Sequence, residues 1–285
     1  YLNGCSFAKV KSIPNLKKGF FYNYYCHDIV FSWSKIISDE FRKYHKLKIK
    51  NFIISGFPYY YKNYKKKNHN QFITLKKIKK NFVKKGFKKT ILLLDTNHSS
   101  NLSNQTQVIM TKDMINYYNQ VLKFVNNNNL SLIVKSKKKT FFNGLISGIK
   151  KNLDISKKKE NIHIITDQGY MNFVFEDIVD FAISIQISPS SSFYEWLLIN
   201  KRGVVFDNST KNKVHNLKIK NTYDNFHFLM NNLNKKLLNK KFGIWDYYKK
   251  NLNSYNDLYG ADRIGEYIFQ LKKNLNKNLS KNNAI

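Results

Sequence analysis

Hydrophobic residues gather in short runs that alternate with helical patterns along the chain. Five apolar runs, each ended by polar residues, predict strands at 89–97, 130–137, 161–167, 179–185 and 203–207. Apolar residues recur at helical spacing over 114–125, 171–178 and 193–200, and a further helix is expected between the second and third strands. The resulting order is β-α-β-(α)-β-α-β-α-β. It is typical of a parallel sheet, so we expect an α/β, Rossmann-like domain.

A second α/β unit precedes this domain. It is indicated by a strand near 28–32, a helix near 34–45 and a strand over 51–55 that ends in a Gly/Pro turn. We therefore expect four parts, namely a partial N-terminal α/β domain over 1–61, a basic linker helix over 62–88, the Rossmann-like domain over 89–245, and a C-terminal helix and tail over 246–285.

The segment 62–89 contains twelve lysines and no acidic residue. Leu75, Ile78 and Phe82 recur within it at helical spacing, which predicts a basic amphipathic helix. Such a helix either docks on an anionic membrane surface or rests its apolar stripe on the protein core, and we favour the second interpretation. No apolar run reaches the roughly 18 residues that a membrane-spanning helix needs.

The net charge of +32 is compatible with nucleic acid, an anionic membrane or a phosphorylated substrate. However, lysine pairs are scattered along the whole chain, and Asn, Ile, Phe and Tyr are abundant as well, which is typical of an AT-rich genome. No nucleic-acid reading motif accompanies the charge, so we do not expect nucleic acid as a partner. Cys5 and Cys26 match neither a zinc spacing nor a disulfide framework, and we expect a cytoplasmic protein.

Polar residues follow each predicted strand, where parallel sheets bind their ligands. The candidates for donor binding are Thr96, Asn97, Lys135, Lys137, Asp167, Gln168, Ser190, Ser191 and Ser192. The helix that begins near Ser192 offers free N–H groups and a positive dipole end, and the serines add hydroxyl donors without bulk, so a diphosphate fits there. Glu195 stands three residues after Ser192, so a simple capping box is the alternative interpretation.

Several common site types are missing from the sequence. Neither a GxGxxG nor a GxxxxGK[ST] motif occurs, which argues against dinucleotide oxidoreductases and P-loop NTPases. A DxD pair is absent too, and no two histidines or carboxylates share a metal-ligand spacing. We therefore expect no metal and no cofactor. Lys135 and Lys137 either neutralise a diphosphate or are ordinary surface lysines.

Three stretches resemble GT-B glycosyltransferases. "VDFAISIQISPSSSFYEWLLINKRGVVFD" (179–207) resembles their donor-domain segment, with a strand, a Ser-rich turn, a helix bearing Glu and a second strand. "DIVFSWSKIISDEFRKYHKLKIKNFIISGFP" (28–58) resembles the end of the acceptor domain in bacterial surface-polysaccharide transferases and CDP-glycerol glycerophosphotransferase-like proteins. "LYGADRIGEYIFQLKKNL" (258–275) is similar to their C-terminal Asp-Gly-x-Ala-x-x-Arg-Ile helix.

The resemblance implies a GT-B-like fold that binds a nucleotide-sugar or CDP-activated donor between two domains. Its diphosphate would lie on the turn 190–192, and Glu195 would contact ribose or sugar hydroxyls. A glycan or lipid-linked molecule would be the acceptor. The transfer also needs a general base, for which His27, Asp28 and His98 are the candidates.

We thus expect a metal-independent glycosyltransferase or glycerol-phosphate transferase of capsule, lipopolysaccharide or similar surface-glycan synthesis. It would be cytoplasmic, with peripheral contact to the inner face of the cell membrane through 62–89 as an option. A nucleotide-sugar 2-epimerase of the same fold is the alternative enzyme. A basic nucleic-acid- or membrane-surface-binding protein without catalysis is the alternative of another class.

Overall fold

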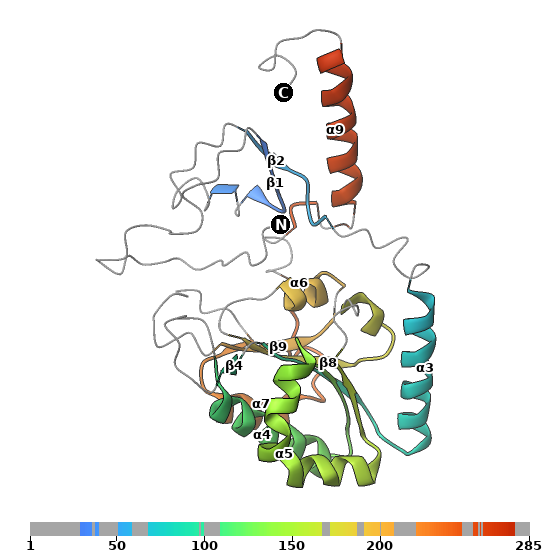
Figure 1. Ribbon diagram of the computed structural model, residues 1–285, viewed down its shortest axis with the longest axis vertical. Helices are drawn as coiled ribbons and strands as arrows, with labels where there is room; N and C mark the ends of the chain where they lie inside the picture. The colour runs from blue at the N-terminus through green and yellow to red at the C-terminus, as the bar shows by residue number, and fades with distance from the viewer. Residues whose placement is uncertain are drawn as a thin grey trace, which may run out of the picture. The chain divides into compact units, whose positions relative to one another are not determined.

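The computed structural model describes residues 29–35, 38–39, 51–58, 68–96, 98–99, 109–166, 172–186, 191–199, 201–207, 221–246, 253–255, 257 and 259–276. For Ser99, Asn172, Phe173, Gln186, Ser191, Ser192 and Tyr194 it describes the backbone only. The described residues belong to two compact units (Figure 1). The first unit comprises 68–245, and the second brings 29–58 together with 246–276.

A parallel sheet of six strands forms the centre of the first unit. Its strands are β3 (Thr90–Leu94), β6 (Ser131–Lys135), β7 (Ile162–Ile165), β8 (Phe181–Gln186), β9 (Gly203–Asp207) and β10 (Thr222–Tyr223). They stand in the order β10-β9-β8-β3-β6-β7, and every pair is parallel. The five predicted strands and their parallel arrangement are thereby confirmed, while β10 was not predicted.

Helices cover both faces of this sheet (Figure 1). On one face α4 (Thr111–Asn127) packs between α5 (Lys139–Lys159) and α7 (Phe226–Lys236). The other face carries α3 (His69–Lys84), the short 3-10 helix η1 (Asn172–Phe175) and α6 (Ser191–Leu198), with η1 in contact with both neighbours. A two-residue parallel pair, β4 (His98–Ser99) and β5 (Ile109–Met110), lies in the connection between β3 and α4.

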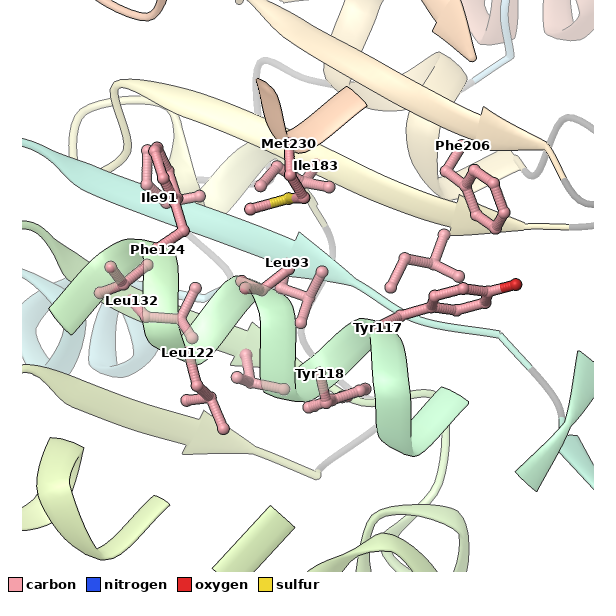
Figure 2. Packing of buried hydrophobic residues seen from close by; sticks show 14 of the residues in the cluster. Ile91, Leu93, Tyr117, Tyr118, Leu122, Phe124, Leu132, Ile183, Phe206 and Met230 are labelled. Carbon is pink, nitrogen blue, oxygen red and sulfur yellow. The ribbon is translucent and has the colours of Figure 1, made fainter. Parts of the chain in front are cut away.

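Strand β3 is apolar from Ile91 to Leu94 and is buried on both faces. Leu93 faces α4 and belongs to the same buried cluster as Tyr117, Leu122 and Phe124 of that helix (Figure 2). Leu92 and Leu94 lie on the opposite face of the sheet and are 0% and 3% exposed. Burial on both sides therefore explains why the strand appears in the sequence as a continuous apolar run rather than an alternating one.

The basic helix α3 rests on the first unit through its apolar stripe. Phe72, Leu75 and Phe82 are buried there. The Lys79 amine donates hydrogen bonds to the Thr90 hydroxyl and the Asp180 carboxylate, both at 3.0 Å, which ties the helix to the amino-terminal edge of the sheet. These contacts support the interpretation of this segment as a helix docked on the core.

The helix expected over 171–178 was predicted incorrectly. The chain forms only the 3-10 helix η1 followed by a turn, in which the N–H groups of Ile178 and Val179 both bond to the Phe175 carbonyl. Val174, Phe175, Ile178 and Val179 are all buried, so this segment turns its apolar side chains inward without a helical stripe.

The second unit contains the parallel pair β1 (Ile29–Ser32) and β2 (Asn51–Ile54), as predicted, and the helix α9 (Gly260–Asn276). The predicted turn after β2 is present, since Gly56 adopts a φ of +80°. A side chain at Gly56 would also come within 2.8 Å of the Asn253 amide oxygen, so only glycine fits.

Arg263 fastens α9 to the end of β2. Its guanidinium pairs with the Asp257 carboxylate, donates to the Ser55 carbonyl at 3.0 Å and lies 3.7 Å from the centre of the Tyr255 ring. Gly260 and Arg263 belong to the C-terminal stretch 258–275 that resembles the glycosyltransferase helix, and Asp257 directly precedes this stretch. In this structure Arg263 binds the carboxylate of Asp257.

Candidate functional site

The chain changes direction within the sheet between β3 and β8. From β3 it proceeds through α4 to β6 on one side, and from β8 it proceeds through α6 to β9 on the other. Open parallel sheets bind ligands at the carboxyl ends of the strands at such a point. The residues that follow β3 and β8, together with their neighbours after β6, therefore form the candidate site.

Asp95, the first residue after β3, is held in place by two elements. The Tyr118 hydroxyl of α4 donates to Oδ2 at 2.8 Å, and the Lys137 backbone N–H donates to Oδ1 at 2.6 Å. Burial raises the pKa of Asp95, although both hydrogen bonds lower it. Asp95 thus links α4 to the turn after β6.

Neither Asp95 nor Tyr118 was among the predicted site residues. A carboxylate directly after a buried strand was the available signal for Asp95. Tyr118 lies within the apolar stripe of an amphipathic helix, so its polar role could not be separated from packing in the sequence.

Lys135, the last residue of β6, was predicted as a diphosphate ligand and has carboxylates as electrostatic neighbours in the structure. It stands in register with Leu94 of β3, which in turn stands in register with Ser184 of β8. This row lies on the face of the sheet that carries α6. Burial lowers the pKa of the Lys135 amine, and the negative charges of Glu195 and Asp95 oppose that decrease.

Glu195 is buried, with only 5% of the residue exposed, and its negative charge is one of those that act on the Lys135 amine. The helix begins at Ser191, so Ser192 lies within its first turn. The Trp196 indole N–H donates to the Arg202 carbonyl at 3.0 Å and holds α6 against the start of β9.

His98 has a partner for each ring nitrogen. The Phe141 carbonyl accepts from Nε2–H at 3.0 Å, so Nδ1 is the nitrogen that accepts from the Thr111 hydroxyl, also at 3.0 Å. The ring is 8% exposed. To take a proton from an acceptor, the imidazole would have to give up one of these bonds, and the geometry favours a positioning role.

The other predicted residues are described only in part. Thr96 is half-buried and Lys137 is exposed, and both follow strand ends in the candidate site. Ser191 and Ser192 are in the first turn of α6, where only their backbone is described. His27, Asp28, Asn97, Asp167, Gln168 and Ser190 lie outside the described residues.

Neither a metal cluster nor a membrane span is found within the described parts of the chain. No three histidine, cysteine or carboxylate side chains there are grouped so that they could hold a metal ion. Among the helices of these parts, none combines the length and the apolar character that crossing a membrane requires.

No family model and no curated protein matches the chain. Solved structures do match. Two are variants of the wall teichoic acid polymerase TagF. The variant with a histidine replaced by alanine has a TM-score of 0.53 at 16% identity, with 89% of this chain covered. The variant with a histidine replaced by asparagine has a TM-score of 0.52 at 14% identity, with 88% of this chain covered. A glycosyltransferase from Rickettsia africae ESF-5 has a TM-score of 0.50 at 13% identity and covers 85% of this chain.

The chain has a GT-B-like α/β fold. This confirms the fold class and the resemblance predicted from the three sequence stretches. The chain spans 59% of the two TagF chains and 63% of the Rickettsia chain. At this level of identity the likeness concerns the fold, while donor and acceptor have to be inferred from the site.

Proposed function

We propose that the first unit binds the nucleotide-activated donor of a group-transfer reaction, and that the chain acts as a glycosyltransferase or glycerol-phosphate transferase. The observation that carries this proposal is the position of α6, whose amino end and buried Glu195 lie where the chain changes direction in a GT-B-like sheet. Diphosphates bind well at such a helix end, because backbone N–H groups and the helix dipole favour negative charge.

In the proposed arrangement the donor diphosphate accepts hydrogen bonds from the turn 190–192 and the first turn of α6. The two carboxylate oxygens of Glu195 accept hydrogen bonds from the ribose hydroxyls, which suits a diol. As the bond to the transferred group breaks, negative charge grows on the leaving nucleotide, and the N–H groups of α6 stabilise it without a metal ion.

We propose that His27 or Asp28 acts as the general base. His98 is less suitable, because both of its ring nitrogens are already hydrogen-bonded. The acceptor is proposed to be a glycan or lipid-linked precursor of a surface polysaccharide. Both assignments rest on the resemblance of 28–58 to an acceptor domain and on the wall polymer that the name of the TagF neighbours indicates.

Thermal unfolding with a panel of nucleotides tests the proposal. UDP, CMP or CDP is expected to raise the unfolding temperature of the wild type, because a ligand that binds the folded state stabilises it. Glu195→Ala and Ser191→Ala should remove this shift. Glu266→Ala, which alters an exposed carboxylate on α9, is the control and should preserve it.

Two outcomes would reject the proposal. If no nucleotide or nucleotide sugar shifts the wild type while DNA or RNA binds in a salt-sensitive manner, the chain is a nucleic-acid-binding protein. If a nucleotide sugar binds and is converted to its 2-epimer without transfer to an acceptor, the reaction is epimerisation.

A further inference from the structure

One carboxylate joins the turn after β6 to helix α4. Oδ1 of Asp95 accepts from the Lys137 backbone N–H at 2.6 Å, and Oδ2 accepts from the Tyr118 hydroxyl at 2.8 Å. The Asp95 N–H also reaches the Lys135 carbonyl at 3.5 Å. Asp95 therefore contacts the turn 135–138 at two backbone positions, and Tyr118 holds the carboxylate that makes one of these contacts.

Further contacts fix the same turn. The Ser136 N–H donates to the Ile165 carbonyl of β7 at 2.9 Å, and the Ser136 hydroxyl donates to the Lys138 carbonyl at 3.1 Å. The Lys138 amine lies 5.5 Å from the centre of the Phe141 ring. The side chain of Lys137, by contrast, is exposed. The backbone of the turn is thus held by both neighbouring strands, while the Lys137 side chain extends from it.

The turn 135–138 belongs to the same edge of the sheet as the proposed donor site. Only β3 stands between β6 and β8, so the carboxyl ends of these two strands are about 10 Å apart, which is two strand spacings. Helix α6 follows β8 and offers its first turn to the diphosphate. A lysine amine that approaches from the side of β6 would add a positive charge to the backbone N–H groups of α6.

We infer that Asp95 is a positioning residue of the donor site, which holds the turn 135–138 so that Lys137 contacts the donor diphosphate. This inference rests on the proposed function and adds a residue that the sequence did not indicate. Asp95 is itself unsuited to bind the diphosphate, because protein donors occupy both of its oxygens and its negative charge repels phosphate. Its contribution therefore depends on the geometry that it imposes on the turn.

Titration calorimetry with CDP and UDP tests this role. Lys137→Met should weaken the nucleotide that the wild type binds by about tenfold, because a charged hydrogen-bonding partner is lost. Asp95→Ala should weaken it by about fivefold or more, and should add no further loss in a Lys137→Met background. Lys139→Met, which removes an exposed lysine at the start of α5, is the matched control and should bind like the wild type.

Asp95→Asn separates a positioning role from a role of the negative charge. The asparagine oxygen can accept from the Lys137 N–H, and its NH₂ group can donate to the Tyr118 oxygen, so both links are kept without the charge. We expect Asp95→Asn to bind the nucleotide within about twofold of the wild type. If it binds as weakly as Asp95→Ala, or if the loss in Asp95→Ala persists without Lys137, the inference is wrong.

Amide hydrogen exchange without ligand distinguishes this inference from the proposed function. The Lys137 N–H exchanges when its bond to Asp95 opens, so Asp95→Ala should accelerate its exchange by about tenfold or more. Ile133, which pairs with both neighbouring strands in the middle of β6, is the internal reference and should change much less. Where Asp95→Ala does not fold, Tyr118→Phe takes its place, because it frees Asp95 from α4 and should accelerate the same exchange by about threefold.

The two possible failures give different results. Unchanged exchange at Lys137 would overturn the inference even if nucleotides bind. Faster exchange at Lys137, combined with a wild type that binds no nucleotide, would reject the proposed function and uphold Asp95 as the residue that holds the turn.

Discussion

At the scale of the residue, His98 joins three segments of the first unit. It belongs to β4, its Nδ1 accepts from Thr111 at the start of α4, and its Nε2–H donates to the Phe141 carbonyl in α5. We predict that His98→Ala lowers the free energy of unfolding by about 1–3 kcal/mol, because buried polar partners lose their bonds. Urea unfolding measures this loss, and nucleotide affinity should change by less than about threefold.

His69→Ala is the control for this prediction, because His69 is an exposed residue at the start of α3. Unchanged stability of His98→Ala combined with loss of group transfer would instead identify His98 as the general base.

At the scale of the element, Lys79 adds polar contacts between α3 and the sheet to those of the apolar stripe. Lys79 reaches both Thr90 and Asp180, whereas the neighbouring Lys80 is exposed. We predict that Lys79→Met lowers the free energy of unfolding by about 1–2 kcal/mol, more than a surface ion pair alone contributes, because the Thr90 hydroxyl loses a partner as well. Lys80→Met should stay within about 0.5 kcal/mol of the wild type.

Equal effects of the two lysine variants in urea unfolding would contradict this assignment. They would mean that the apolar stripe of Phe72, Leu75 and Phe82 holds α3 by itself.

At the scale of the whole molecule, the second unit contains an ion pair between Asp257 and Arg263 that is lost at low pH, when the carboxylate is protonated. The hydrogen bond from Arg263 lowers the pKa of Asp257. The folded state therefore favours the ionised carboxylate, and its stabilising contribution is present above the ordinary value of about 4 and is lost as the pH falls through the lowered pKa.

We predict that Asp257→Asn destabilises the second unit at pH 7, and that the difference from the wild type shrinks below pH 4. Thermal unfolding of both proteins between pH 2.5 and pH 7 measures this trend. Asp262→Asn, which changes an exposed aspartate in the first turn of α9, should follow the wild type over the whole range. A difference that is independent of pH would show that the loss concerns packing and not the charge.

The buried strands could be predicted from sequence because burial on both faces leaves a plain signature. Runs such as Thr90–Leu94 and Gly203–Asp207 are apolar, short and bounded by polar residues, and they form β3 and β9. The strand β10, by contrast, has two half-buried residues at the sheet edge, and nothing in its sequence separates it from a loop.

From the sequence, the candidate site could be predicted only as a set of polar residues that follow strand ends. The search at the carboxyl ends of the predicted strands named Lys135, and the helix that follows the fourth predicted strand named Glu195, and both remain predictions as site residues. The hydrogen-bond partner of each residue depends on how the strands and helices pack against one another. The link from Asp95 to Tyr118 and the partners of His98 are contacts between elements, and a linear pattern does not contain them.

The most direct measurement is a crystal structure of the chain with the nucleotide that gives the largest thermal shift. The diphosphate should accept hydrogen bonds from the backbone N–H groups of the first turn of α6, and the ribose hydroxyls should lie at the Glu195 carboxylate. A nucleotide bound anywhere other than the carboxyl edge of the six-stranded sheet would contradict the proposed donor site.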